Sequence, residues 1–228
     1  MRAALLLALW MTWIGLVRPV HAAAAAAAAA TATAEVKVTP TPASVSRKTF
    51  DPKHPPADMP PLTRDEAAVT QSKFACGVKL DVEISQTGDE KPVARIAGVD
   101  TTLRLDIVEW LPKDATAKIR AHEEGHRQIS EMYYAPAEQV ARDLAAKYVG
   151  KTLDIPGTDE KQTQPIIQRA ANQFCQEYLG KIEVPSQAAQ EKYDQLTEHG
   201  RNKLNEKEAI RRATADAPAA SAAPTTHP

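Results

Sequence analysis

Two ten-residue stretches alternate apolar and polar side chains, and this period of two constrains the fold more than any other feature of the chain. The first, CGVKLDVEIS, covers residues 76–85, and the second, TTLRLDIVEW, covers residues 101–110. Their apolar positions are Val78, Leu80, Val82 and Ile84 in the first stretch and Leu103, Leu105 and Ile107 in the second. A strand with one buried face shows this alternation. With a shorter strand at KPVARIAG, after a turn signal at TGDE, the sequence predicts a small antiparallel sheet.

The pattern becomes helical after Pro112. Asp114 is suited to cap a helix that begins at Ala115 and runs to about Tyr134. Three further helices are predicted: one that ends at about Tyr148, one capped by Thr163 and broken at Pro185, and one over residues 187–198 with Gly200 at its end. The predicted fold class is therefore α+β, with a small antiparallel sheet followed by a helical region.

The two ends of the chain differ in composition from this central region. The N-terminus has a positive Arg2, an apolar run over residues 3–17 and small residues at a cleavage site after Ala22, as in a secretory signal. The apolar run is shorter than the roughly 20 residues of a membrane span, although an uncleaved anchor is the alternative. We predict a signal peptide at 1–22, an Ala/Pro-rich disordered spacer at 23–66, a folded domain at 67–211 and a disordered tail at 212–228.

The charge of the chain indicates no polyanionic partner. Removal of the signal takes away Arg2 and Arg18, which leaves 26 of 28 basic residues against 29 acidic ones and a net charge of −3. No basic stripe follows any predicted element. We therefore expect no nucleic-acid partner. From the signal-like N-terminus we expect no stable membrane insertion after signal cleavage, and a periplasmic or secreted location.

The chain has two cysteines, Cys76 and Cys175, which are 99 residues apart. Because export leads to an oxidising compartment, we predict a disulfide between them, with two free buried thiols as the alternative. Closure of so long a loop stabilises a fold by roughly 4–5 kcal/mol in chain-entropy estimates, less any strain.

The segment RAHEEGHRQI, residues 120–129, carries a His-Glu-x-x-His pattern within the first predicted helix. Residues four apart lie on one helix face, so His122 and His126 can bind one metal ion. Glu123 is turned about 100° away, where a general base for an activated water belongs. The alternative is a solvated helix face, since Glu124 and Arg127 are charged.

A catalytic zinc site needs a third protein ligand and an open fourth position. Three of the six histidines fall in the predicted signal, spacer and tail, which leaves His199 as the third histidine of the folded domain. His199 is at a predicted helix end beside Gly200, which would let the backbone turn away. Glu198 and Glu131 are the rival third ligands.

The pair of motifs HEEGHRQI and YDQLTEHGRN, residues 193–202, resembles a bacterial family described as predicted secreted zinc-dependent proteases, formerly a domain of unknown function. The likeness covers residues 75–211. It implies a zincin-like metallopeptidase domain over 67–211, with Zn²⁺ as cofactor, His122 and His126 as ligands, Glu123 as catalytic base, and His199 as third ligand. The substrate would be a protein or peptide.

Three residues near His199 have two interpretations each. Tyr193 could stabilise a developing oxyanion or be an ordinary core residue, and Arg201 could do the same or lie on the surface. Asp194 could accept a hydrogen bond from a ligand histidine or be a surface carboxylate. We expect an exported zinc peptidase. The alternative is a non-catalytic envelope interaction protein with a structural metal site or none.

Overall fold

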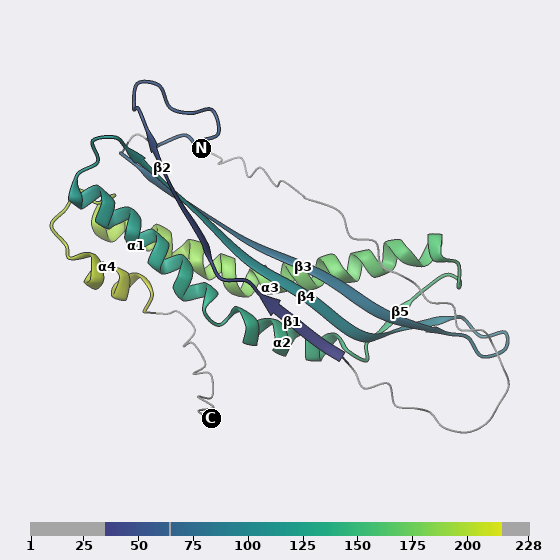
Figure 1. Cartoon of the computed structure of the whole chain (residues 1–228). Helices are drawn as coiled ribbons and strands as arrows, with labels where there is room; N and C mark the ends of the chain where they lie inside the picture. The colour runs from purple at the N-terminus through teal and green to yellow at the C-terminus, as the bar shows by residue number, and fades with distance from the viewer. Residues whose placement is uncertain (1–34, 64, 216–228) are drawn as a thin grey trace, which may run out of the picture.

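The computed structural model describes residues 35–63 and 65–215, so the predicted signal peptide and alanine tract lie outside the described residues. One five-stranded sheet and four helices make up this part of the chain (Figure 1). The strands are β1 (Glu35–Pro40), β2 (Ser44–Phe50), β3 (Val69–Ser85), β4 (Val93–Pro112) and β5 (Thr152–Asp154). The helices are α1 (Ala117–Tyr134), α2 (Ala137–Tyr148), α3 (Glu160–Thr197) and α4 (Glu206–Ala213).

Strand β4 is the centre of the sheet, and every other strand pairs with it. β3 runs antiparallel along it from residue 93 to residue 110 and occupies one edge. Three strands pair with the other edge of β4. β5 runs antiparallel to β4, and β1 and β2 run parallel to it. The prediction of a small antiparallel sheet is therefore wrong, since the sheet is larger and two of its strands run parallel to the central one.

The two parallel strands come from the segment that the composition predicted to be a disordered spacer. Residues 35–40 and 44–50 pair with β4, so the prediction of disorder over 23–66 is wrong for this stretch. The side chains of β2 are exposed except for Phe50. β2 is held mainly by backbone pairing with β4, whereas β1 also packs Val36 and Val38 on the core.

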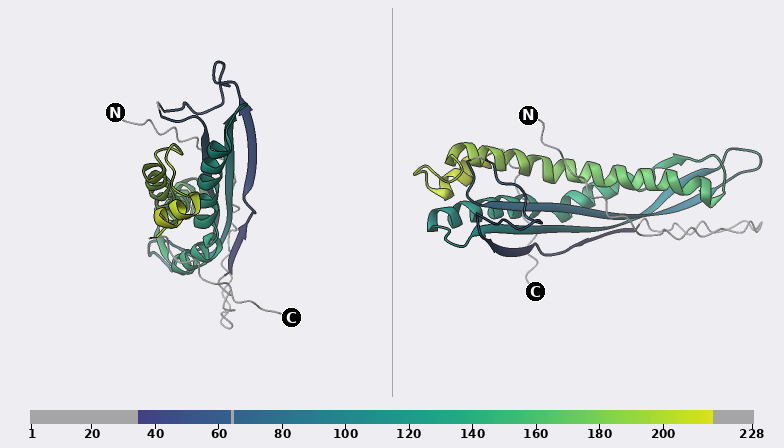
Figure 2. Two further views of the ribbon diagram at one scale, coloured as in Figure 1. Left: turned by 90° about the vertical axis from the view of Figure 1, so that its left-hand side faces the viewer. Right: turned by 90° about the horizontal axis from the view of Figure 1, so that it is seen from above.

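The helices pack on one face of the sheet, as an end-on view shows (Figure 2). Leu103, Leu105 and Ile107 are 0–1% exposed and point into the core, as their alternation predicted. Side chains of α2 and α3 complete this core, among them Leu144, Phe174 and Tyr178. On the opposite face, most side chains of β3 and β4 are polar or charged, except at the end where Trp110 packs with Phe50 and Met59.

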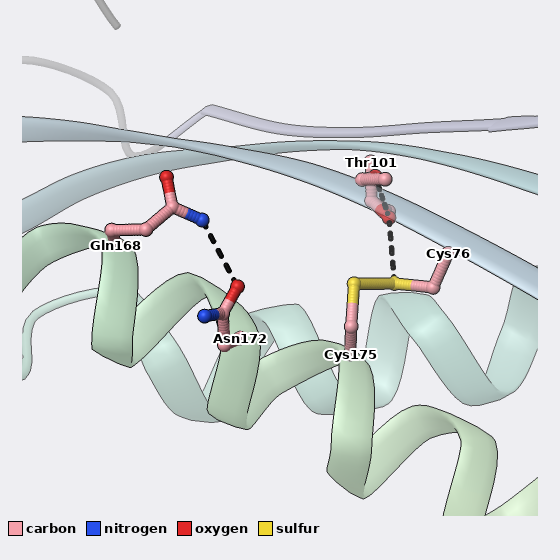
Figure 3. Close-up of a disulfide and its surroundings, with 6 residues drawn as sticks. Cys76, Thr101, Gln168, Asn172 and Cys175 are labelled. Carbon is pink, nitrogen blue, oxygen red and sulfur yellow. Dashed lines mark hydrogen bonds between the residues drawn. A yellow bond between two sulfur atoms is a disulfide. The ribbon is translucent and has the colours of Figure 1, made fainter. Parts of the chain in front are cut away.

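A disulfide joins Cys76 of β3 to Cys175 of α3, which confirms the predicted pairing (Figure 3). The two Cα atoms are 5.5 Å apart, within the normal range for such a bond. The bond fixes α3 against the strand that also borders the candidate site described below. No helix in this part of the chain is both long and apolar enough to cross a membrane.

Helix α3 is a single element of 38 residues, although a break was predicted at Pro185. Its buried stripe continues through Ile182, Ser186 and Ala189, so packing on both sides of the proline outweighs the lost backbone hydrogen bond. Its N-cap is Asp159 rather than Thr163, and the N-cap of α1 is Thr116 rather than Asp114. The continuous helix connects the disulfide rigidly to the region around Tyr193.

Candidate metal centre

Two histidines of α1 point their ring nitrogens at each other. The Nε2 atoms of His122 and His126 are 3.2 Å apart, and the two rings meet edge to face. His122 is 5% exposed, and His126 is also largely covered. The helical spacing predicted this approach, and the solvated-face alternative does not describe two imidazoles that are removed from water.

Asp194 of α3 completes a triangle with these two nitrogens. Its Oδ1 atom lies 3.2 Å from Nε2 of His122 and 3.0 Å from Nε2 of His126. Ligands bound to zinc at 2.0–2.1 Å in tetrahedral geometry are about 3.3–3.4 Å apart, so all three edges fit such an ion. These three residues are the group of described side chains whose ligand atoms lie close enough to hold a metal.

Gln190, one helical turn before Asp194, fixes the tautomer of His126. Its Nε2 donates to the carbonyl of His126 at 2.9 Å, and this acceptor sets which end of the amide is nitrogen. Its Oε1 therefore faces Nδ1 of His126 at 2.6 Å and must accept a hydrogen bond from the N–H at that position. With the proton on Nδ1, the Nε2 atom of a neutral His126 carries a free lone pair.

Thr197 fixes His122 in the same way. Its hydroxyl donates to the carbonyl of Tyr193 at 2.7 Å, so its oxygen is left to accept from Nδ1 of His122 at 3.4 Å. Both imidazoles thus direct a lone pair at one point. Two lone pairs and a carboxylate oxygen repel one another unless a cation lies between them, and this arrangement fits a metal ion.

The carboxylate of Asp194 supplies negative charge to this point. Burial raises the pKa of this carboxyl, but positive charge on His122 and His126 outweighs burial and lowers the pKa below the ordinary value; with neutral imidazoles, a cation between the three groups would supply that charge. No described residue gives its Oδ1 a hydrogen bond of ordinary geometry, although the atom is buried. The oxygen is thus ionised, and it is available as a ligand.

Glu123 lies beside the triangle, in the same cavity. The residue is 4% exposed, and its Oε2 accepts a hydrogen bond of 2.8 Å from the hydroxyl of Thr70 on β3. Burial raises the pKa of this carboxyl above its ordinary value, more than the nearby histidines and Thr70 lower it. A buried carboxylate held next to a metal position has the placement of a general base.

His199 is near the triangle without being part of it. Its Nδ1 lies 3.6 Å from Oδ1 of Asp194, buried and without a hydrogen bond from the described residues. α3 ends at Thr197, after which the backbone is left-handed at three residues, Glu198, His199 and Gly200, with φ of 51°, 54° and 74°. A Cβ on Gly200 would lie 2.9 Å from Cγ of His122, so glycine permits this turn to close over the site.

The rival ligands lie elsewhere. Glu131 pairs with Arg127 at 2.5 Å, and the exposed Glu198 is not in the metal-ligand group. Arg201 lies on the surface, where its guanidinium binds Asp65 at 2.8 Å.

Tyr193 packs against both histidines instead of facing the cavity. Its ring stacks on His122 with centroids 4.9 Å apart and meets His126 edge to face at 5.0 Å. The hydroxyl donates to Glu206 at 2.5 Å, and Glu206 accepts from Lys118 at 2.6 Å. This proton is already used within the fold, so Tyr193 holds the imidazole rings in place.

Gly125, the residue directly before the second histidine, is as important as the motif itself. A Cβ on Gly125 would lie 2.1 Å from the hydroxyl oxygen of Tyr193 and 2.5 Å from its Cζ. The absence of a side chain at Gly125 is thus what allows the tyrosine ring to reach the histidines. Gly125, Gln190, Thr197 and Thr70 were not identified from the sequence; the spacing of Gln190, Asp194 and Thr197 by four and three residues was the available signal.

We expect Gly125→Ala to destabilise the protein by about 1–3 kcal/mol, because Tyr193 is held by Glu206 and cannot withdraw freely. Chemical denaturation of the metal-free chain measures this change. Gly180→Ala is the matched control: it lies in α3, nothing is within 4 Å of its Cβ position, and a gain of about 0.5–1 kcal/mol is expected there. Equal stability of the two variants would contradict the packing role of Gly125.

The triangle opens into a cavity of about 340 Å³ between β3, α1 and α3. His122, Glu123, His126 and Asp194 all line it, together with Thr70. A substrate could therefore reach both the metal position and the proposed base.

Comparison with known proteins adds no relative: no family model, no curated protein and no solved structure matches the chain. The resemblance to predicted secreted zinc proteases remains a prediction that rests on the two motifs.

Proposed function

We propose that this protein is an exported zinc-dependent peptidase, with His122, His126 and Asp194 as metal ligands and Glu123 as general base. One observation carries the proposal. Both imidazoles have their Nδ1 protons committed to Gln190 and Thr197, so their Nε2 lone pairs meet the Asp194 oxygen within 3.2 Å.

A zinc ion bound there supplies Lewis acidity, which polarises a carbonyl and lowers the pKa of water. Glu123 accepts the proton of the attacking water and then delivers it to the leaving nitrogen as the peptide bond breaks. Thr70 orients the carboxylate of Glu123 through its hydrogen bond of 2.8 Å. Tyr193, Gln190 and Thr197 keep the imidazoles in position while this happens.

The disulfide supports an exported protein, since such bonds persist in oxidising compartments. The signal-like N-terminus points the same way. Both cysteines are in the disulfide, so neither can close the metal site as a fourth ligand.

The position of His199 supports a second candidate function. Its Nδ1 is 3.6 Å from Asp194, so a small movement would allow it to close the site as a fourth protein ligand. A site with four protein ligands is typical of structural zinc, and the protein would then be a non-catalytic envelope interaction protein.

Metal content and hydrolysis of the mature chain, purified from the periplasm, test both candidates. We expect about one zinc per chain, cleavage of a casein or mixed-peptide substrate, loss of cleavage on dialysis against a chelator, and recovery on addition of zinc. Zinc without cleavage of any peptide would favour the structural candidate, and a chain that binds no zinc would contradict both. Circular dichroism before and after chelation checks that the fold is retained.

A further inference from the structure

The cavity at the metal site has one wall made by a single stripe of α3. Its members follow one another at intervals of three and one residues, which places them on one helix face: Glu183, Ser186, Gln187, Gln190, Glu191 and Asp194. The opposite wall is β3, with Thr70, Ser72 and Phe74. The metal position lies at one end of the α3 stripe, because Asp194 is its last member.

The charged groups in this lining are all acidic apart from the two histidines. Glu66, Glu123, Glu183, Glu191 and Asp194 line the cavity, and no lysine or arginine of the described residues does. Glu66 accepts a backbone hydrogen bond from Thr63, and Glu123 and Asp194 belong to the site. Glu183 and Glu191 have no such role, and neither forms an ion pair with the described residues.

Glu183 is partly buried, and no cationic side chain within residues 35–63 and 65–215 forms an ion pair with it. Its nearest hydrogen-bond donor is the amide of Gln187, at 3.4 Å, and burial raises the pKa of its carboxyl. An acid in this position is costly to ionise unless a positive charge accompanies it. Glu191 is exposed and faces the same cavity.

The strand side of the cavity suits an extended chain. Among the described strands, β3 pairs only with β4, so the N–H and C=O groups on its outer edge have no strand partner. An extended peptide is the kind of ligand that binds such an edge, through its own backbone.

Helix geometry sets where the two carboxylates lie relative to the metal position. At 1.5 Å per residue, Glu191 is about 4–5 Å from Asp194 along α3 and Glu183 is about 16 Å away. An extended peptide advances about 3.3 Å per residue, so these distances correspond to about one and about five residues.

We propose that the cavity selects extended peptides with basic side chains on one side of the scissile bond, about one and about five residues from it, held by Glu191 and Glu183. This specificity rests on the proposed peptidase function. Lysine or arginine at these positions would supply the positive charges that the two carboxylates lack within the described fold.

Binding tests the proposal without requiring turnover. The zinc-loaded mature chain with Glu123→Gln is titrated with a fluorescein-labelled twelve-residue peptide that carries two lysines four residues apart, and with the same peptide carrying norleucine at both positions instead. We expect about tenfold tighter binding of the lysine peptide, and about threefold loss of this preference for each of Glu183→Gln and Glu191→Gln.

Glu83→Gln is the matched control, since it removes the same charge from an exposed position of β3 outside the cavity. It should leave the preference unchanged. An equal preference in all variants, or none in the parent, would overturn the proposal. If the preference behaves as expected but the wild-type chain cleaves no peptide, the peptidase function fails and the basic-peptide selectivity stands.

Discussion

Glu123→Gln is expected to reduce peptide hydrolysis by about 10²–10⁴-fold while zinc stays bound, because the amide cannot accept the proton of the attacking water. The substitution preserves the shape of the side chain and the oxygen that accepts from Thr70 at 2.8 Å. His122 and His126 would keep their tautomers, since Gln190 and Thr197 are untouched. Initial rates on a fluorogenic peptide and zinc content measured on the same sample check this result.

Glu124→Gln makes the same chemical change at the next residue and is the matched control. The carboxylate of Glu124 binds Arg47 of β2 and Arg127 of α1 and does not line the cavity. A loss of partly exposed ion pairs costs about 0–1 kcal/mol of stability and should leave the rate within a few-fold of wild type. Comparable rates for Glu123→Gln and wild type would rule out the proposed base.

Asp194→Asn is expected to weaken zinc binding by more than about 100-fold, because it removes the charged ligand. Loss of a group that merely supports a ligand already costs 10–100-fold, and a ligand should cost more. The asparagine fills the same space between the two histidines, so the fold should be retained. Competition against a chelator of known affinity measures the dissociation constant of each variant.

His199→Ala separates the two assignments of the third ligand. With Asp194 as the ligand, His199→Ala should weaken zinc binding by about tenfold or less. The Nδ1 atom of His199 lies 3.6 Å from the Asp194 carboxylate, so His199 influences the metal only through that ligand. A large loss of zinc affinity in His199→Ala, together with a small loss in Asp194→Asn, would instead identify His199 as the third ligand.

The two alternating stretches predicted β3 and β4 because a half-buried strand has a period that the sequence displays directly. β3 begins earlier than predicted, at Val69, and β4 joins the separately predicted strand at KPVARIAG to the stretch at 101–110 in one strand, Val93–Pro112. β2 escaped prediction because it is held by backbone bonds to β4 and its side chains carry little pattern, and β1 was missed although Val36 and Val38 alternate, because its pattern covers too few residues in a Pro- and Thr-rich segment. The continuity of α3 through Pro185 depends on packing against β3 and α1, which the sequence does not record.

By itself the sequence determined the pairing of Cys76 with Cys175, as the two cysteines of the chain, and the approach of His122 to His126, which one turn of helix imposes. Only the tertiary structure decided that Asp194 meets the two histidines. That contact requires α3 to lie across α1, and it depends on Gly125 leaving room for Tyr193. The physical reason is that helical period fixes neighbours within an element, whereas packing between elements fixes which residue of a distant helix reaches them.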